Sequence, residues 1–420
     1  MNFAKLGFYP ADILIPADSD MTKWSVVACD QYTSEPEYWQ AREAEIGDAP
    51  STMKLTLPEI YLEDANVDER IVGINAEMDR CIDGGIFANY ENSFVYLERR
   101  QANGKVRHGL IGKIDLEDYS YIPGDGTFIR ATEGTILSRI PPRVKVRENA
   151  ALEFPHIMLL VDDREDILLG SIRREKDNLV KLYDFDLCGG GGHSDGYLVD
   201  GHMLEVVAQN LEKLTDKDDF KAKYDIEDER VLLFAVGDGN HSLATAKEHW
   251  ERLKKADTSL VGTDHPARYA LVEVVNIHDE SLEFEPIHRV IFETDPEALF
   301  AAIKADNGEP EQAYEIEYVY GNNSGIVKLD MAKSGLAVGA LQGFLDKYLE
   351  EHGGRIDYIH GDDVVNSLCK AEGTIGFKLP PIEKSSLFRG VILDGVLPRK
   401  TFSMGEAHDK RYYLEGRRIK

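Results

Sequence analysis

Apolar positions along the chain fall into two kinds of spacing, and the two kinds alternate. Continuous apolar runs at 157–161 and 231–236 have the length of buried strands, whereas Val67, Ile71 and Ile74 repeat at helical spacing. Such alternation is typical of α/β to α+β folds, in which mixed sheets are flanked by helices. Strands are expected at 24–29, 93–97, 108–114, 154–161, 231–236, 268–276, 286–292, 325–329 and 356–360, and helices at 35–46, 67–82, 163–182, 204–214, 243–253, 338–349 and 362–372.

Turn-forming residues separate several of these elements. The pair Asn103-Gly104 predicts a hairpin between the strands at 93–97 and 108–114. The glycine-rich segment 188–196 predicts a flexible connector or lid, because no Lys-Ser/Thr pair follows it as in a phosphate-binding P-loop.

The length of 420 residues favours more than one domain. We expect an N-terminal mixed α/β region with a hairpin at 1–150, a central region at 151–300 and a C-terminal α/β region at 301–420. No internal repeat and no glycine- or proline-rich linker fixes these boundaries, so they are soft.

The net charge of −28 disfavours nucleic acid as a partner, because phosphate backbones repel an acidic surface. Basic residues do gather between positions 130 and 147. A stripe this short suits a small phosphorylated ligand, or it offsets an acidic body. Its members are Arg130, Arg139, Arg143, Lys145 and Arg147.

Nothing in the sequence predicts a membrane partner. No apolar stretch approaches the ~20 residues that a membrane span requires, and the N-terminus lacks the order of a secretory signal. Four widely spaced cysteines fit a reducing compartment and exclude a cysteine-rich zinc module. We therefore expect a cytoplasmic protein; its oligomeric state stays open.

The segment 231–250 carries the strongest candidate for chemistry. An apolar strand runs into Gly237, Asp238 and Gly239, after which helical spacing begins. This geometry points backbone N–H groups and a helix dipole at a bound anion. Asp238 could bind Mg²⁺ or accept a proton from a hydroxyl, although an Asp before a helix is also a common cap. Asn240, His241 and Ser242 would complete the turn.

Two other segments offer residues that could contribute to such a site. Arg130 could bind a phosphate bidentately and Glu133 could act as a base or metal ligand, or the two could form a surface ion pair. His288 and Arg289 end an acidic strand, where they could meet a ligand. His156 lies in an apolar run and is more typical of a core histidine than of a catalyst.

Together these segments resemble the DUF1015 family of uncharacterised bacterial proteins, over most of the chain. The family's central motif, Asp-Gly-His-His-Arg after a strand, is similar to the signature turn of the ParB/sulfiredoxin-like fold, which includes free-serine kinases that use ADP or ATP. This chain matches at Asp238, Gly239 and His241, but has Asn240 and Ser242 in place of the first His and the Arg. The resembling segments are 26–39, 109–119, 130–135, 236–246, 286–289 and 397–401.

The resemblance implies a ParB/sulfiredoxin-like core around 231–254 and a small-molecule phosphotransferase that uses Mg²⁺ and ADP or ATP to phosphorylate a hydroxyl metabolite such as free serine. The catalytic residues would be Asp238, which would also bind the metal, with His241 and Glu133. Loss of the motif Arg favours an alternative, a non-catalytic nucleotide- or metabolite-binding regulator. Nucleotide turnover discriminates the two. Phosphate- or substrate-binding residues would be Gly237, Gly239, Asn240, Ser242, Arg130, His288 and Arg289.

Overall fold

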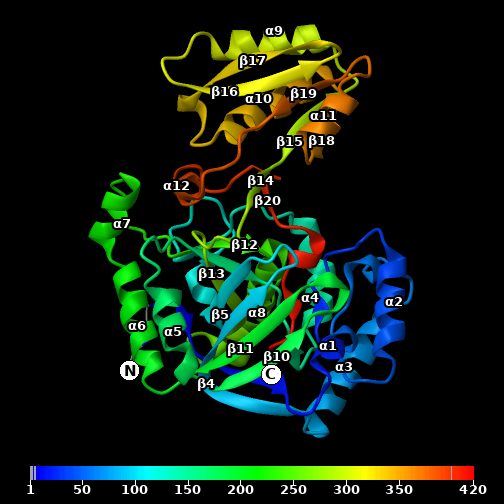
Figure 1. The fold of residues 1–420 in the computed structure, drawn as a ribbon, viewed down its shortest axis with the longest axis vertical. Coiled ribbons are helices and arrows are strands. Elements are labelled where there is room, and N and C mark those ends of the chain that lie inside the picture. Colours follow the sequence, from blue (N-terminus) through cyan, green and yellow to red (C-terminus); the bar gives the residue numbers. More distant parts are fainter. Residues whose placement is uncertain (1–2, 4–5, 399) are drawn as a thin grey trace. The chain divides into compact units, whose positions relative to one another are not determined.

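The computed structural model describes residues 3, 6–398 and 400–420, which form two compact units (Figure 1). Unit 1 comprises Met1–Ala131, Thr135–Leu282 and Glu406–Lys420, and unit 2 comprises Thr132–Gly134 and Glu283–Gly405. The chain thus leaves unit 1 after Leu282 and returns to it at Glu406. These limits differ from the expected ranges 1–150, 151–300 and 301–420, which follow sequence order. Arg399, in the 397–401 segment, lies outside the described residues.

An 11-stranded mixed sheet is the framework of unit 1 in the described part of the chain. The spatial order is β10-β11-β4-β5-β13-β9-β12-β7-β6, with β1 paired to β5 and β2 to β4. Pairing is parallel between β13 and β9, antiparallel between β9 and β12, and parallel again between β12 and β7. The strands are β1 Phe8–Tyr9, β2 Ala11–Pro16, β4 Phe87–Arg100, β5 Val106–Asp115, β6 Tyr119–Ser120, β7 Ile129–Arg130, β9 Met158–Val161, β10 Lys181–Asp186, β11 His193–Val199, β12 Phe234–Asp238 and β13 Tyr269–Asn276.

In the central strands of this sheet both faces are buried. Along β4, Phe94 and Tyr96 belong to one apolar cluster while Val95 and Leu97 belong to another, as the alternation of side chains on a strand requires. Apolar residues of α5, α6 and α8 pack into the first cluster. The helices of unit 1 are α1 Met21–Trp24, α2 Pro36–Ile46, α3 Val67–Asp83, α4 Ile140–Arg147, α5 Leu168–Glu175, α6 Met203–Leu214, α7 Lys217–Tyr224 and α8 Asn240–Ala256.

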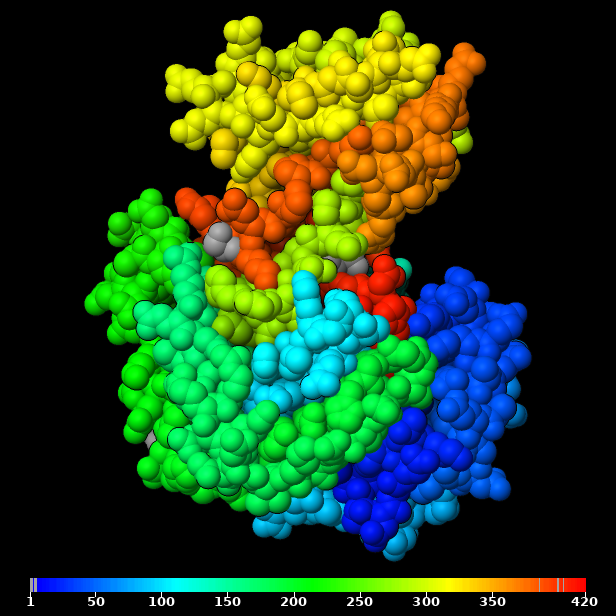
Figure 2. All heavy atoms as spheres, viewed as in Figure 1, coloured from blue at the N-terminus to red at the C-terminus, as the bar shows by residue number. Residues whose placement is uncertain are grey.

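The C-terminal segment 406–420 is an integral part of unit 1. Its strand β21 (Tyr412–Tyr413) pairs with β3 (Val26–Val27), and β22 (Arg417–Arg418) pairs with β8 (Leu152–Glu153). Leu414 packs in the second apolar cluster of the sheet. The space-filling view shows only a small patch of the red end of the chain at the surface (Figure 2), whereas Tyr412, Tyr413 and Leu414 are buried.

Unit 2 is built on an antiparallel sheet of five described strands in the order β17-β16-β19-β15-β18. These are β15 His288–Phe292, β16 Ala313–Tyr320, β17 Asn323–Asp330, β18 Arg355–Ile359 and β19 Ile375–Lys378. A separate ribbon pairs β14 (Phe284–Pro286) with β20 (Phe402–Met404). The helices are α9 Pro296–Asn307, α10 Ala337–His352, α11 Asp362–Leu368 and α12 Lys384–Asp394.

The predicted mixed α/β class is confirmed, as is the hairpin of β4 and β5. Several local predictions are wrong; for example, the expected strand at 24–29 is reduced to β3, because Trp24 belongs to α1. The segment 188–196 is not a long flexible connector, because β11 begins at His193 and pairs with β10 as a hairpin. The expected helix at 163–182 is shorter, since α5 ends at Glu175 and β10 begins at Lys181. Within the described residues, no helix has the length and apolar character needed to cross a membrane.

Candidate functional site

The strand–turn–helix segment around Asp238 folds on a glycine. Strand β12 ends at Asp238, Gly239 has a φ of 81°, and α8 begins at Asn240. A Cβ atom on residue 239 would lie 3.0 Å from the Cα atom of Ile157. The turn therefore requires glycine both for its left-handed backbone and for its close approach to the segment before β9. As a result, the N-terminus and dipole of α8 point to the surroundings of Asp238.

We expect the Gly239→Ala variant to lose about 1–3 kcal/mol of unfolding free energy, the usual cost of forcing a non-glycine residue into this backbone region. Urea unfolding followed by tryptophan fluorescence measures it, because Trp24, Trp39 and Trp250 all lie buried in unit 1. Gly262→Ala is the matched control: its φ is 77°, but no atom lies within 4 Å of the added Cβ. A smaller loss at 239 than at 262 would contradict the crowding at Ile157.

Asp238 is held by its own turn and by the C-terminal segment. Its Oδ1 atom accepts a hydrogen bond of 2.9 Å from the Gly239 N–H, and its Oδ2 atom lies 3.5 Å from Nζ of Lys410. The Asp238 side chain is 19% exposed. Lys410 could not be found from the sequence, because no local pattern links a lysine just before the last two strands to a turn in the middle of the chain.

A second carboxylate joins the site through His156. The ring is 4% exposed; its Nε2 atom lies 3.4 Å from Oδ2 of Asp30 and 3.4 Å from Oγ of Ser242. Its Nδ1 atom lies 2.9 Å from the hydroxyl oxygen of Tyr413. The sequence favoured a core position for His156, and the ring is buried, but its partners are charged or polar. Asp30 follows β3 and lies within the 26–39 segment that resembles the family's N-terminal motif. That resemblance is the sequence feature from which a role for Asp30 could have been predicted.

The pKa values of Asp30 and His156 shift in opposite directions. Burial opposes the charged form of each group, but their mutual attraction outweighs it, so the pKa of Asp30 is lowered and the pKa of His156 is raised. Asp238 and Glu59 also raise the pKa of His156. The Asp30 carboxylate and the His156 ring therefore form a pair in which each group favours the charged form of the other.

This pair predicts a pH-dependent stability. The contribution of His156 is complete below its unfolded pKa of about 6.5 and disappears as the pH rises through the raised folded value. The contribution of Asp30 is complete above about 3.9 and disappears as the pH falls through the lowered folded value. The stability difference between wild type and Asp30→Asn should thus be largest between about pH 4 and 6.5 and shrink at higher pH. Melting temperatures across pH 3–9 measure it; a difference independent of pH would contradict the ion pair.

His241 lies beside a cationic segment. Its Nε2 atom accepts a hydrogen bond from the N–H of Ile136 at 3.4 Å, which leaves the proton of the neutral ring on Nδ1. Burial lowers the pKa of His241, and the positive charges of Arg139 and Arg143 lower it further. A neutral histidine with an N–H donor, next to two arginines, is suited to bind an anion.

Arg143 connects this cationic segment to the Asp30 region. Its Nε atom donates to Oε1 of Glu59 at 2.8 Å, and the backbone N–H of Glu59 donates to the carbonyl of Cys29 at 2.9 Å. Two members of the basic stripe expected to bind a phosphorylated ligand, Arg139 and Arg143, thus lie near His241.

Arg130 is engaged elsewhere. It is buried, its Nε atom donates to the carbonyl of Thr127 at 2.9 Å, and a terminal nitrogen donates to the carbonyl of Arg230 at 2.6 Å. These bonds fix β7 beside β12 and direct Arg130 to backbone carbonyls.

The other three predicted residues belong to unit 2. Glu133 forms a bridge with Leu397, and His288 Nε2 lies 2.9 Å from Oδ1 of Asp362. The guanidinium of Arg289 is fully buried, and its Nε atom donates to Gln342 at 3.0 Å. The turn residues 237–242 therefore belong to unit 1, whereas Glu133, His288 and Arg289 belong to unit 2.

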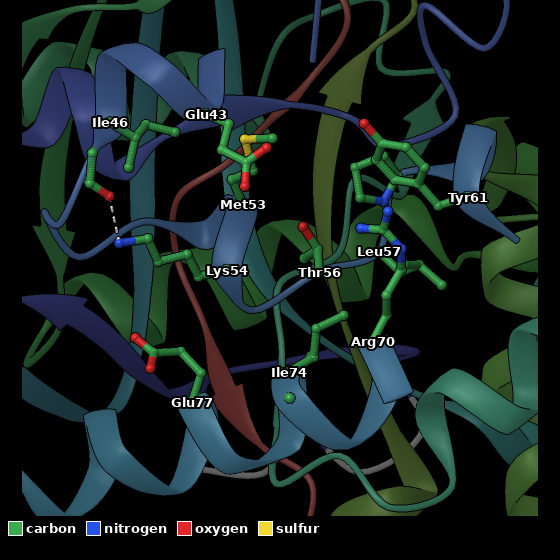
Figure 3. Close-up of a pocket in the computed structure, with 13 residues that line it drawn as sticks. Glu43, Ile46, Met53, Lys54, Thr56, Leu57, Tyr61, Arg70, Ile74 and Glu77 are labelled. Carbon is green, nitrogen blue, oxygen red and sulfur yellow. Dashed lines mark hydrogen bonds between the residues drawn. The ribbon is translucent and has the colours of Figure 1, made fainter. Parts of the chain in front are cut away.

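A separate cavity of about 390 Å³ lies between α2 and α3 (Figure 3). Its wall is apolar at Ile46 and Ile74, and its two cationic side chains have partners in the protein: Lys54 donates to the carbonyl of Gly47 at 2.8 Å, and Arg70 lies 4.2 Å from the ring centroid of Tyr61. None of the predicted site residues lines this cavity.

Fold and site define a mixed α/β protein whose charged side chains gather at the N-terminus of α8, a helix with one buried face. The family profile described as protein of unknown function (DUF1015) matches residues 11–348. The chain belongs to this family, which confirms the resemblance drawn from its motifs.

Three solved structures are similar to the chain at low identity. They are a mutant free serine kinase in complex with ADP (TM-score 0.37, 10% identity, 75% of this chain and 93% of that chain), the same mutant with AMP (0.38, 10%, 75% and 93%), and SbnI with a C-terminal truncation from Staphylococcus aureus (0.35, 9%, 70% and 82%). Comparison with curated proteins finds no match. Because likeness of this degree assigns no activity, the function has to be argued from the site.

Proposed function

We propose that unit 1 is a nucleotide-dependent phosphotransferase that acts on a small hydroxyl compound such as free serine. The observation that carries the proposal is the meeting of two carboxylates, Asp30 and Asp238, with His156 and Lys410 at the N-terminus of α8. Phosphoryl transfer depends mainly on positioning and on neutralising phosphate charge, and this group provides both acidic and cationic side chains.

The residue roles follow from their positions. The turn 237–242 and the start of α8 offer backbone donors to a phosphate, and His241 supplies a further donor. Arg139 and Arg143 add positive charge nearby, although the guanidinium of Arg143 is bound to Glu59 and to the carbonyl of Arg139. The hydroxyl oxygen of the acceptor bonds to the terminal phosphorus, its proton passes to the Asp238 carboxylate, and the bond from phosphorus to the bridging oxygen breaks with its electron pair left on the nucleotide.

The donor set also fits Mg²⁺, which prefers carboxylate oxygens and water. The Oδ2 atom of Asp238 forms a 3.5 Å ion pair with Lys410. Asp30 adds a second carboxylate to the same group of charged side chains. Asp238, with Asp30 beside it, would hold the ion. When bound, the metal would neutralise charge on the phosphates of the nucleotide.

A second candidate function is a non-catalytic nucleotide- or metabolite-binding regulator. Asn240 and Ser242 favour it, since they replace the His and Arg of the central motif, and Arg130 is occupied by backbone carbonyls. In that case the site would bind nucleotide without turnover.

Calorimetric titration of the whole protein with ADP and ATP, with and without Mg²⁺, tests the proposal, followed by product analysis with an amino-acid pool. The phosphotransferase predicts nucleotide binding and a phosphorylated hydroxyl product. Binding without product supports the regulator. Failure to bind any nucleotide at millimolar concentration would contradict the phosphotransferase and leave a metabolite-binding regulator as the better hypothesis.

A further inference from the structure

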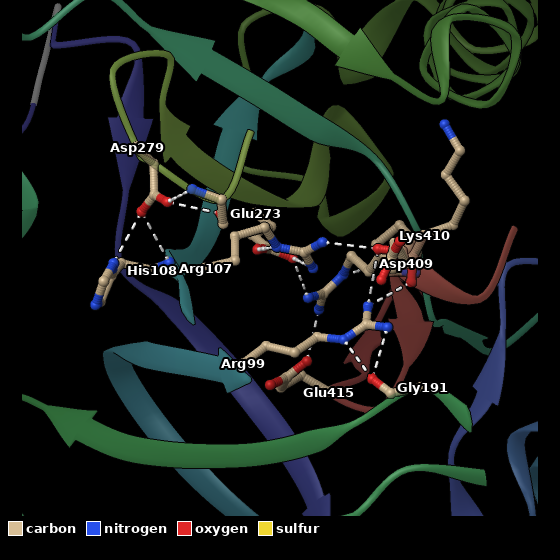
Figure 4. A network of polar contacts seen from close by, with 12 residues as sticks. Arg99, Arg107, His108, Gly191, Glu273, Asp279, Asp409, Lys410 and Glu415 are labelled. Atoms are coloured by element: carbon tan, nitrogen blue, oxygen red, sulfur yellow. Dashed lines mark hydrogen bonds and ion pairs between the residues drawn. The ribbon is translucent and has the colours of Figure 1, made fainter. Parts of the chain in front are cut away.

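The backbone on both sides of Lys410 is fixed by buried arginines (Figure 4). Arg99 is 2% exposed, and its guanidinium donates to the carbonyls of His408, Asp409 and Lys410 and to that of Gly191. All of these acceptors are main-chain carbonyls, so the side chain is committed to the path of the C-terminal segment.

Two more arginines extend this network. Arg107 donates to the carbonyl of Asp409 at 3.0 Å and to Glu273 at 3.1 Å. Arg411 donates to Glu273 at 2.7 Å and to Glu415 at 2.6 Å. Residues 408, 409, 410 and 411 are therefore each held by a charged hydrogen bond at the main chain or the side chain.

Burying these charged groups to attach the C-terminal segment carries a large desolvation penalty. Three guanidinium groups face two carboxylates, and burial, with the nearby charge of Arg107, lowers the pKa of Arg99 to about 9. Buried ion pairs are often matched or exceeded in stability by well-packed apolar residues, so stability alone does not explain them. What a fully bonded polar network gives in addition is one defined geometry.

The geometry fixed here is that of Lys410. Its side chain leaves the network and extends away from it (Figure 4). The ammonium lies 3.5 Å from Oδ2 of Asp238, and the Lys410 side chain is 17% exposed. The pKa of Asp30 is lowered mainly by His156, with smaller contributions from Gln31 and from the charge of Lys410. Where the central motif has an arginine this chain has Ser242, and Lys410 places a positive charge at the same turn.

We infer that Lys410 is a ligand-binding residue that contacts a phosphate of the nucleotide, and that the buried arginine network positions it. The inference rests on the proposed function and adds the cation that the turn itself lacks. A binding residue whose backbone is already fixed by its neighbours loses less conformational entropy when it contacts a ligand.

The test compares ADP binding by wild type, Lys410→Met, Lys410→Gln and Lys410→Arg. Losing one charge-assisted contact should weaken ADP binding about 10- to 100-fold, and the Arg variant should recover part of the affinity. Lys255→Met is the matched control, because Lys255 lies in the last turn of α8, at the end opposite the site. Its ADP affinity should equal that of wild type.

The outcomes separate the two proposals. If wild type binds no ADP, the proposed function fails and this inference fails with it. If wild type binds ADP and the Met and Gln variants bind equally well, only the role of Lys410 is overturned. A melting temperature lowered in both variants, with no recovery of affinity by Lys410→Arg, would assign Lys410 to structure and also overturn the inference.

Discussion

The Glu273→Gln variant is expected to lose about 3–5 kcal/mol of unfolding free energy, as buried ion pairs do when one partner is removed. Glu273 is fully buried and lies between Arg107 and Arg411. Burial opposes its ionisation, but the two arginines outweigh burial and hold its pKa below the ordinary value. Removing the negative charge deprives the buried guanidinium of Arg107 of its carboxylate partner and leaves Arg411 paired with Glu415 alone.

Urea unfolding followed by tryptophan fluorescence measures this loss. Glu212→Gln is the control: Glu212 lies on the exposed side of α6, and the change should stay within about 0.5 kcal/mol. The Glu273 variant should also bind ADP more weakly, because Arg107 no longer holds the path of residue 409. A Glu273 loss no larger than that of the control would show that the network is not a buried charge pair.

Asp238→Asn should reduce phosphoryl transfer by about 10²–10⁴-fold, the usual contribution of a positioned proton acceptor. Asparagine keeps an oxygen that can accept the Gly239 N–H, so the turn and the melting temperature should change little. Binding of ADP without Mg²⁺ should be unchanged or tighter, since a negative charge near the phosphates is removed.

Initial rates and ADP titrations of the two proteins give both readouts. Asp177→Asn removes an exposed carboxylate from the turn after α5 and should leave both unchanged. Turnover by Asp238→Asn equal to that of wild type would exclude Asp238 as the proton acceptor.

Parts of this structure that depend on local pattern could be predicted from the sequence. The hairpin of β4 and β5 follows from Asn103-Gly104, and α8 follows from helical spacing after Gly239. The first residue of β12 depends on distant segments and could not be predicted from the local pattern. The strand begins at Phe234 and not at residue 231, because pairing with its two neighbours starts there: Phe234 pairs with Ile129, the first residue of β7, and with Val161, the last residue of β9.

The partners of the site could not be predicted, because they come from distant segments. Tyr413 meets His156 across 257 positions, and Glu273 meets Arg107 across 166. An apolar run around a histidine indicates burial, which is true of His156, but carries no information on Asp30. Arg130 shows the converse: its residue type suggested a phosphate ligand, whereas the fold uses it to bind two carbonyls.

The most direct test of a nucleotide site at the start of α8 is a crystal structure of the protein with ADP and Mg²⁺. We expect a phosphate within hydrogen-bonding distance of the 237–242 turn, with the Lys410 ammonium and the His241 ring beside it. ADP bound elsewhere, for example in the cavity between α2 and α3, with the turn empty at saturating nucleotide, would contradict it.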